Sequence, residues 1–142
     1  MTKEAEKIIA ATFQVSRLLR RKIAQAENGV KSINMLQLYA LSYIKERYKA
    51  TMKEFADHMQ VSPPSATSFI DRLVKMGLVK RLPSRTNRKI VQLKLTPLGN
   101  STLTKTLQQE KHIFRPIVEA LSRNDQQHML RILQSILQQK HS

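Results

Sequence analysis

The chain lacks cysteine and tryptophan and contains only three glycines among its 142 residues. Without cysteine it has no disulfide, thiolate zinc site, cysteine nucleophile or thiol redox switch. So few glycines leave no glycine-rich loop for nucleotide phosphates, and the HExxH and GxSxG motifs are absent as well. The four histidines are scattered, which favours solvent-exposed side chains over metal ligands. We therefore expect no enzyme activity, no cofactor and no metal.

Long apolar segments are also missing. The amino terminus does not run into the apolar region of a signal peptide, and no stretch approaches the roughly 18 apolar residues that a membrane span needs. Hydrophobic residues still make up 41% of the chain, and its length falls in the usual range for one domain. These features predict a single domain over residues 1–142 that is soluble, cytoplasmic and not bound to a membrane.

Acidic residues are scarce. The chain has 10 Asp and Glu against 25 Lys and Arg, which gives a formal net charge of +15. Asp71 is the only acidic residue between His58 and Gln109, and residues 72–94 include eight basic residues and no acidic one. Such an excess favours a polyanionic partner, because each Lys or Arg that neutralises a phosphate releases a condensed counterion. Nucleic acid is the first expectation and an anionic membrane surface the second, while a basic face that only aids solubility is the alternative.

Apolar periodicity and capping residues predict six helices. The first is amphipathic and covers about residues 3–26, before Asn28-Gly29 ends it. The other five begin after residues that favour the N-cap position, namely Asn34, Thr51, Ser62, Thr96 and Ser122. Gly77 is expected to end the fourth helix and Pro116 to kink the fifth.

The periodicity changes from helical to alternating after Gly77. Residues 78–82 and 90–95 alternate as strands do, and the seven residues between them contain no hydrophobic side chain except Pro83. We therefore expect a β-hairpin with a basic, exposed tip. The resulting fold class is mainly α with a small β-hairpin, an α+β arrangement.

Two short helices followed by such a hairpin are typical of a winged helix-turn-helix, with the helix-turn-helix at residues 51–76 and the wing at 78–95. The second helix fits the major groove of B-DNA, and its N-terminus adds free N–H groups and a positive dipole. An arginine at a narrow tip can enter the minor groove, where the potential is strongly negative. The residues expected to contact DNA are Ser62, Pro64, Ser65, Thr67, Ser68, Arg72 and Lys75 on the helix, and Arg85, Arg88 and Lys89 in the wing.

Five short motifs carry a resemblance to a known family. They are Phe55-Ala56-Asp57-His58-Met59, Val61-Ser62-Pro63, Ile70-Asp71-Arg72-Leu73, Gly77-Leu78-Val79 and Leu95-Thr96-Pro97-Leu98-Gly99. In these motifs the chain resembles the MarR family of bacterial transcriptional regulators, and its flanking helices fit that family too. The resemblance implies an obligate homodimer, intertwined through its first and last helices, on a pseudo-palindromic operator. It places the recognition helix at about residues 62–76, the DNA-binding lobe at 33–98, and the dimerisation helices at 1–30 and 100–142.

The wing departs from the family pattern. The family usually carries Asp-x-x-Asp-Arg there, in which the acidic residues orient the arginine, whereas this chain has Ser84 and Asn87 before Arg88. The loss of two carboxylates predicts a wing that is more positive and less rigid. Ser68 also stands where the family often has a longer polar or basic residue, so base recognition is expected to differ.

The terminal helices carry long apolar stripes. These stripes lie within residues 8–23 and 103–137, and the small central lobe has too little mass to cover both. A second copy of the chain would bury them, and a symmetric dimer matches a palindromic pair of half-sites. The alternative is that the stripes pack within one chain.

Tyr39 and Tyr43 lie one helical turn apart and are candidates for binding a small-molecule effector, aromatic or anionic in character, as the family resemblance suggests. Packing in the core is the alternative for both. We predict a homodimeric, sequence-specific regulator of transcription that binds double-stranded DNA and acts as a repressor. Such a ligand is expected to release it from the DNA. The competing hypothesis is a nonspecific nucleic-acid-binding or architectural protein that uses the same basic residues.

Overall fold

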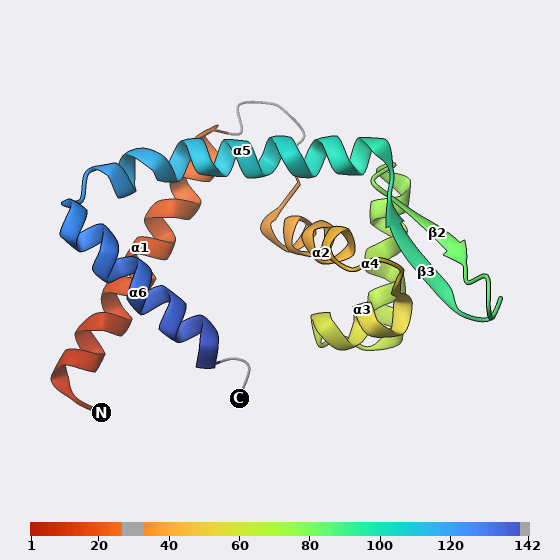
Figure 1. Cartoon of the computed structure of the whole chain (residues 1–142), viewed down its shortest axis with the longest axis horizontal. Coiled ribbons are helices and arrows are strands. Elements are labelled where there is room, and N and C mark those ends of the chain that lie inside the picture. Colours follow the sequence, from red (N-terminus) through yellow and green to blue (C-terminus); the bar gives the residue numbers. More distant parts are fainter. Residues whose placement is uncertain (27–32, 140–142) are drawn as a thin grey trace. The chain divides into compact units, whose positions relative to one another are not determined.

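The computed structural model describes residues 1–26 and 33–139 (Figure 1). Its helices and strands follow in the order α1 (Lys3–Ala26), α2 (Met35–Glu46), β1 (Ala50–Thr51), α3 (Met52–Met59), α4 (Pro63–Lys75), β2 (Val79–Pro83), β3 (Val91–Leu95), α5 (Pro97–Glu119) and α6 (Arg123–Gln139). They divide into two compact units, one spanning Val30–Gln108 and the other joining Met1–Gly29 to Gln109–Ser142. In the described ranges, no helix is both long and apolar enough to span a bilayer.

Side-chain caps begin α2 and α3 where the sequence predicted them. Asn34 and Gln37 form a reciprocal capping box, in which the Gln37 N–H donates to Asn34 Oδ1 at 2.8 Å. The Thr51 hydroxyl accepts from the Glu54 N–H at 3.1 Å. Both caps satisfy N–H groups that have no partner within the first turn of a helix.

Both ends of α4 are also as predicted. The Ser62 hydroxyl accepts from the Ser65 N–H at 3.3 Å, and Pro63 occupies the first helical position, where its missing N–H costs nothing. Gly77, just after the helix, has a φ of +76°. This left-handed backbone favours glycine and turns the chain toward β2.

The hydrophobic core of the unit Val30–Gln108 includes one side of α4. Ala66, Ile70 and Leu73 face it, and none of them is exposed to solvent. Phe55 of α3 is equally buried and belongs to the same cluster. Because the buried positions recur at helical spacing, the opposite side of α4 is left to solvent.

Three antiparallel strands form a small sheet in the order β1-β3-β2. Strands β2 and β3 make the predicted hairpin, with Val79 opposite Leu95. Strand β1 pairs Ala50 with Leu93 on the other side of β3, and the sequence did not indicate it. Two residues are too few to show an alternating pattern, so only the pairing identifies this strand.

A close backbone approach joins the start of α5 to the start of β2. A Cβ atom on Gly99 would lie 2.0 Å from the carbonyl oxygen of Leu78, so the contact requires glycine. The Thr96 N–H donates to the same carbonyl at 3.0 Å, and the Thr96 hydroxyl donates to the carbonyl of Gly77. The base of the hairpin is therefore attached to the lobe through its backbone.

The second unit contains α1, α6 and the end of α5. Ser122 caps α6 as predicted, because its hydroxyl accepts from the Asp125 N–H at 3.1 Å. Helix α5 continues for three residues beyond Pro116. The expected break at Asn28-Gly29 lies outside the described residues.

The apolar stripes of the terminal helices are exposed in the single chain. Neither α1 nor α6 contains a buried residue. Ile8 on α1 is 66% exposed, and Leu130 and Leu137 on α6 are 57% and 62% exposed. Within the unit that contains α1, α6 and the end of α5, the described residues therefore leave the stripes of α1 and α6 uncovered.

Candidate nucleic-acid interface

The residues expected to contact DNA lie on the outer face of α4 and in the wing. On α4 they avoid the buried positions Ala66, Ile70 and Leu73. All ten are exposed to solvent: Ser62, Pro64, Ser65, Thr67, Ser68, Arg72, Lys75, Arg85, Arg88 and Lys89. The fold thus leaves each of these side chains accessible to a large partner.

An open hollow of about 340 Å³ lies on the outer face of α4. Its lining consists of Pro64, Ser65, Ser68, Phe69 and Arg72. Two hydroxyls and a guanidinium supply hydrogen-bonding groups, and the two rings supply apolar surface. Base edges in the major groove offer a matching mixture of donors, acceptors and the thymine methyl group. The partly buried ring of Phe69 packs against the core and also reaches this surface.

Neutral side chains close the turn at the tip of the wing. Ser84 is only 6% exposed, and its N–H donates to the Ile90 carbonyl at 2.9 Å. The Ser84 hydroxyl accepts from the Thr86 N–H, and Asn87 Oδ1 accepts from the Lys89 N–H at 3.0 Å. Serine and asparagine can hold a turn in this way without a carboxylate. Ser84 and Asn87 therefore hydrogen-bond within the turn, and the expectation of a less rigid wing stays a prediction.

Arg85 and Arg88 are the two arginines of the tip, beside Lys89. Across the described ranges, neither forms a hydrogen bond or an ion pair with the protein. With no carboxylate in the wing, their charges are not compensated locally. Such charges suit the strongly negative potential of a narrow minor groove.

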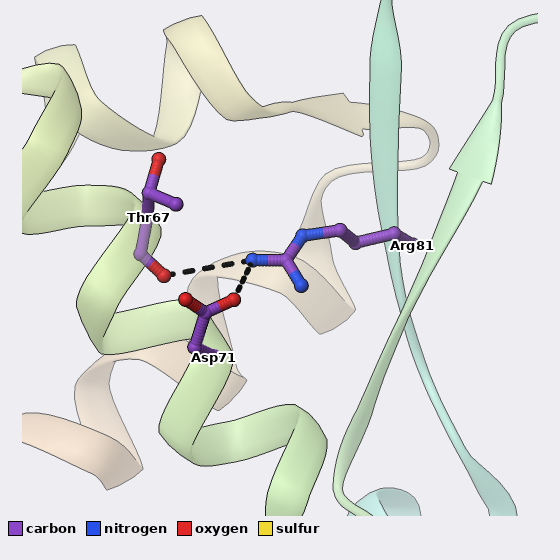
Figure 2. Close-up of polar contacts among 3 residues, drawn as sticks. All are labelled: Thr67, Asp71 and Arg81. Carbon is purple, nitrogen blue, oxygen red and sulfur yellow. Dashed lines mark hydrogen bonds and ion pairs between the residues drawn. The ribbon is translucent and has the colours of Figure 1, made fainter.

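An ion pair links α4 to β2 (Figure 2). Arg81 Nη2 donates to Asp71 Oδ1 and lies 3.5 Å from the backbone carbonyl oxygen of Thr67. The pair neutralises Asp71, the only acidic residue between residues 58 and 109. The sequence alone did not indicate this contact. Strand alternation was the available signal, because Arg81 follows the buried Val79 by two residues and so faces the same side of the sheet.

Tyr39 and Tyr43 of α2 both stack against His58 of α3, with ring centroids 5.2 and 4.0 Å away. The Tyr39 hydroxyl lies 2.7 Å from His58 Nε2, and the guanidinium of Arg47 lies 5.7 Å from the Tyr43 ring centroid. Tyr43 is buried, as the core alternative predicted, whereas Tyr39 is 49% exposed. His58 is exposed to solvent, as the sequence predicted, but the sequence did not indicate its place in this cluster.

The chemistry of the interface is that of hydroxyl, guanidinium and ammonium groups. Among residues 1–26 and 33–139, no group of three or more His, Cys, Asp or Glu side chains could hold a metal ion. Hydroxyls and cationic side chains donate hydrogen bonds to phosphate oxygens and to base edges. The surface is therefore equipped for binding a polyanion.

Residues 33–91, which contain the whole of α2, α3, α4 and β2, match the model of the MarR family. This segment is similar to the MarR family. Proteins of the MarR family are transcriptional regulators.

Known relatives agree with this assignment. The chain is 25% identical over 95 residues to the HTH-type transcriptional repressor MdtR of Bacillus subtilis, an alignment that covers 67% of this chain and only 61% of the length of MdtR. A MarR family protein from Bacillus stearothermophilus has a TM-score of 0.82 at 17% identity, with 100% of this chain and 99% of that chain covered. Streptococcus pneumoniae FabT, solved in complex with DNA, has a TM-score of 0.78 at 17% identity, with 98% and 96% covered. The winged-helix α+β fold is therefore confirmed.

The burial of Tyr43 leads to a prediction about alkaline stability. Burial raises the pKa of Tyr43 above its usual value of 10.0, and Glu54 and Asp57 add to this effect while Arg47 opposes it. The folded state then keeps the Tyr43 proton at a pH where the unfolded state has lost it, so stability falls as pH rises through this range. We expect Tyr43→Phe to lose less of its free energy of unfolding than the wild type between about pH 9 and pH 11.

Denaturant unfolding at a fixed protein concentration measures this difference. Tyr48→Phe is the matched control, because Tyr48 is 89% exposed and the same hydroxyl is removed. The control should follow the wild-type pH profile. Identical alkaline losses in wild type and Tyr43→Phe would contradict the prediction.

Proposed function

We propose that the chain is a DNA-binding transcriptional regulator that acts as a homodimeric repressor on a pseudo-palindromic operator, in the cytoplasm. The observation that carries this proposal is the outer face of the segment that is similar to the MarR family. It combines an exposed, hydroxyl-bearing helix with a basic wing tip, and its one carboxylate is already paired. FabT, which shares the fold, has been solved with DNA, and MdtR is a repressor, so the relatives support the same role.

Recognition in this proposal begins with α4 in the major groove. The N-terminal turn of α4 presents the hydroxyls of Ser62 and Ser65, together with the positive end of the helix dipole, to a phosphate or a base edge. Thr67 offers its methyl group to thymine. Arg72 and Lys75, further along the helix, donate to base edges or to the phosphate backbone. The hollow bordered by Pro64 and Ser68 receives base substituents.

The wing reaches the adjacent minor groove. Arg85 and Arg88 enter it, and Lys89 contacts the phosphates beside it. The turn that Ser84 and Asn87 hold gives these cations a hydrogen-bonded backbone without adding negative charge. Phosphate contacts position the protein, while contacts to bases and to groove shape supply the selectivity.

A second copy of the chain supplies the second recognition helix. Helices α1 and α6 expose apolar side chains that a partner can remove from water, at a gain of about 25 cal/mol per Å² of apolar surface. A two-fold axis then presents two copies of α4 to half-sites about 34 Å apart. Dimerisation thus buries the apolar stripes and also gives the protein the two-fold symmetry of a palindromic operator.

A small-molecule effector would act at the cluster of Tyr39, His58 and Tyr43. Stacked rings with the Arg47 guanidinium nearby suit an aromatic anion, and Tyr39 is the exposed member that a ligand can reach. Binding there would release the repressor by changing the separation of the two recognition helices. Aromatic carboxylates that dissociate the DNA complex, and no longer do so after Tyr39→Ala, would support this role. Dissociation that is insensitive to Tyr39→Ala would exclude it.

Binding to selected and random duplexes separates this function from the nonspecific alternative. We expect duplexes selected from a random pool to bind at least about a thousandfold more tightly than random duplexes of equal length at physiological salt. Fluorescence anisotropy over a range of salt concentrations measures both affinities. Equal affinities, with a steep salt slope of about −0.9 per phosphate contact, would favour an architectural or nonspecific protein.

The wing assignment predicts a large effect of Arg88→Ala. Loss of its minor-groove contact should weaken binding to the selected duplex at least tenfold, or about 1.4 kcal/mol. Arg123→Ala is the control, because it removes the same charge from an exposed position at the start of α6 and should change binding little. Similar losses in the two variants would refute the placement of the wing in the minor groove.

The dimer predicts that a charge in the apolar stripe dissociates the protein. Leu130→Glu places a carboxylate twice in a symmetric interface and should raise the dimer dissociation constant at least about a hundredfold, or 2.7 kcal/mol. Sedimentation velocity over a dilution series measures the constant. Gln127→Glu adds the same charge at an exposed polar position of α6 and should leave the dimer intact. A Leu130→Glu protein that remains dimeric would place the interface elsewhere.

A further inference from the structure

Arg81 contacts two groups that lie one helical turn apart on α4. Its guanidinium donates to the Asp71 carboxylate and to the Thr67 carbonyl oxygen (Figure 2). In the described part of the chain, these are the only side-chain hydrogen bonds between β2 and α4. They connect the middle of strand β2 to α4, the helix proposed to enter the major groove.

Folding stability is a poor explanation for this contact. The side chains of Arg81 and Asp71 are 33% and 51% exposed, and exposed ion pairs contribute little to stability. The base of the wing is already attached, because the Leu78 N–H donates to the Leu73 carbonyl at 3.0 Å and Val79 is buried in the core. Beyond Val79 every residue of β2 is exposed. The Arg81 contact therefore adds a second attachment point outside the core.

The two edges of the hairpin are held by different contacts. Strand β1 pairs with β3 at Leu93 and Gln92, whereas the Arg81 contact ties the β2 edge to α4. Without it, the β2 edge has no side-chain hydrogen bond to α4 in the described residues that would fix its angle to that helix.

The wing extends for about 20 Å between residue 79 and its turn, at about 3.3 Å per residue. A pivot of about 10° would move the tip by about 3.5 Å, which is more than half of the roughly 6 Å width of the minor groove. Small changes of angle at β2 therefore decide whether the tip enters the groove.

We propose that Arg81 is a positioning residue for DNA recognition, which holds the wing at a fixed angle to α4 through Asp71 and the Thr67 carbonyl and does not itself bind phosphate. This inference rests on the proposed DNA-binding function. It also accounts for the one carboxylate of the interface. An unpaired Asp71 would repel DNA, whereas the paired Asp71 holds the arginine that aligns the wing with α4.

Asp71→Asn tests the proposal, because two explanations predict opposite signs. Charge alone predicts that removing a carboxylate near DNA strengthens binding to every duplex. Positioning predicts that the selected duplex is bound at least tenfold more weakly. Random duplexes should be bound as tightly as before or more tightly, and their salt slope should steepen by about one because Arg81 becomes free to bind a phosphate.

Asp57→Asn is the matched control. It makes the same chemical change on α3, where Asp57 is exposed and its side chain forms no hydrogen bond or ion pair within the described residues. This variant should bind the selected duplex at least as tightly as the wild type. A second readout is positional: hydroxyl-radical footprints of Asp71→Asn should lose the minor-groove protection by the wing, while methylation protection of guanines in the major groove persists.

The outcomes separate this inference from the function on which it rests. A wild-type protein that does not distinguish selected from random duplexes refutes the function itself. If the wild type does distinguish them, and Asp71→Asn binds the selected duplex as tightly as the wild type or more tightly, the positioning role is overturned. A large drop in the thermal unfolding midpoint of Asp71→Asn would assign the ion pair to folding and would overturn the role as well.

Discussion

The burial of one side of α4 is the constraint on which the rest of the interface depends. Ala66, Ile70 and Leu73 recur every three or four residues and have no solvent exposure. Burial of a Leu or Ile side chain contributes about 1.5–3 kcal/mol, so turning the helix to expose this side would cost a large part of the stability of a small domain. The outer face, with Ser65 and Arg72, is therefore presented to solvent by the packing of the core. The outer face of α4 needs no further interaction to point toward solvent.

The same core orients the wing through strand alternation. Val79 is buried, so Arg81, two residues along β2, faces the same side of the sheet and reaches α4. The backbone contacts of Thr96 and Gly99 at the base of the hairpin complete the attachment. The wing is thus held at its base by backbone and core contacts, along β3 by its pairing with β1, and on the β2 edge by the Arg81 side chain. Helix α4 and the wing are positioned together because both pack on the same hydrophobic core.

Features that depend on near neighbours could be predicted from the sequence, and those that depend on distant ones could not. The caps at Asn34 and Ser62 involve residues three positions apart, so residue type and spacing suffice. The Asp71–Arg81 pair spans ten positions and the Tyr39–His58 contact spans nineteen, and both require the fold to bring them together. At Ser84 the sequence revealed only that a carboxylate was missing. The buried, hydrogen-bonded hydroxyl that replaces it depends on the closed turn.

The net charge of +15 favours binding to any DNA, and the Asp71–Arg81 ion pair bears on how one duplex is preferred over another. Each cation that contacts phosphate strengthens binding to all DNA, whereas specificity depends on the difference between the right and the wrong duplex. More arginines alone would therefore raise affinity without improving selectivity. A neutral pair such as Asp71–Arg81 adds little to the long-range attraction, because its charges cancel at a distance. By fixing an angle that only one arrangement of grooves satisfies, it stabilises the correct complex selectively.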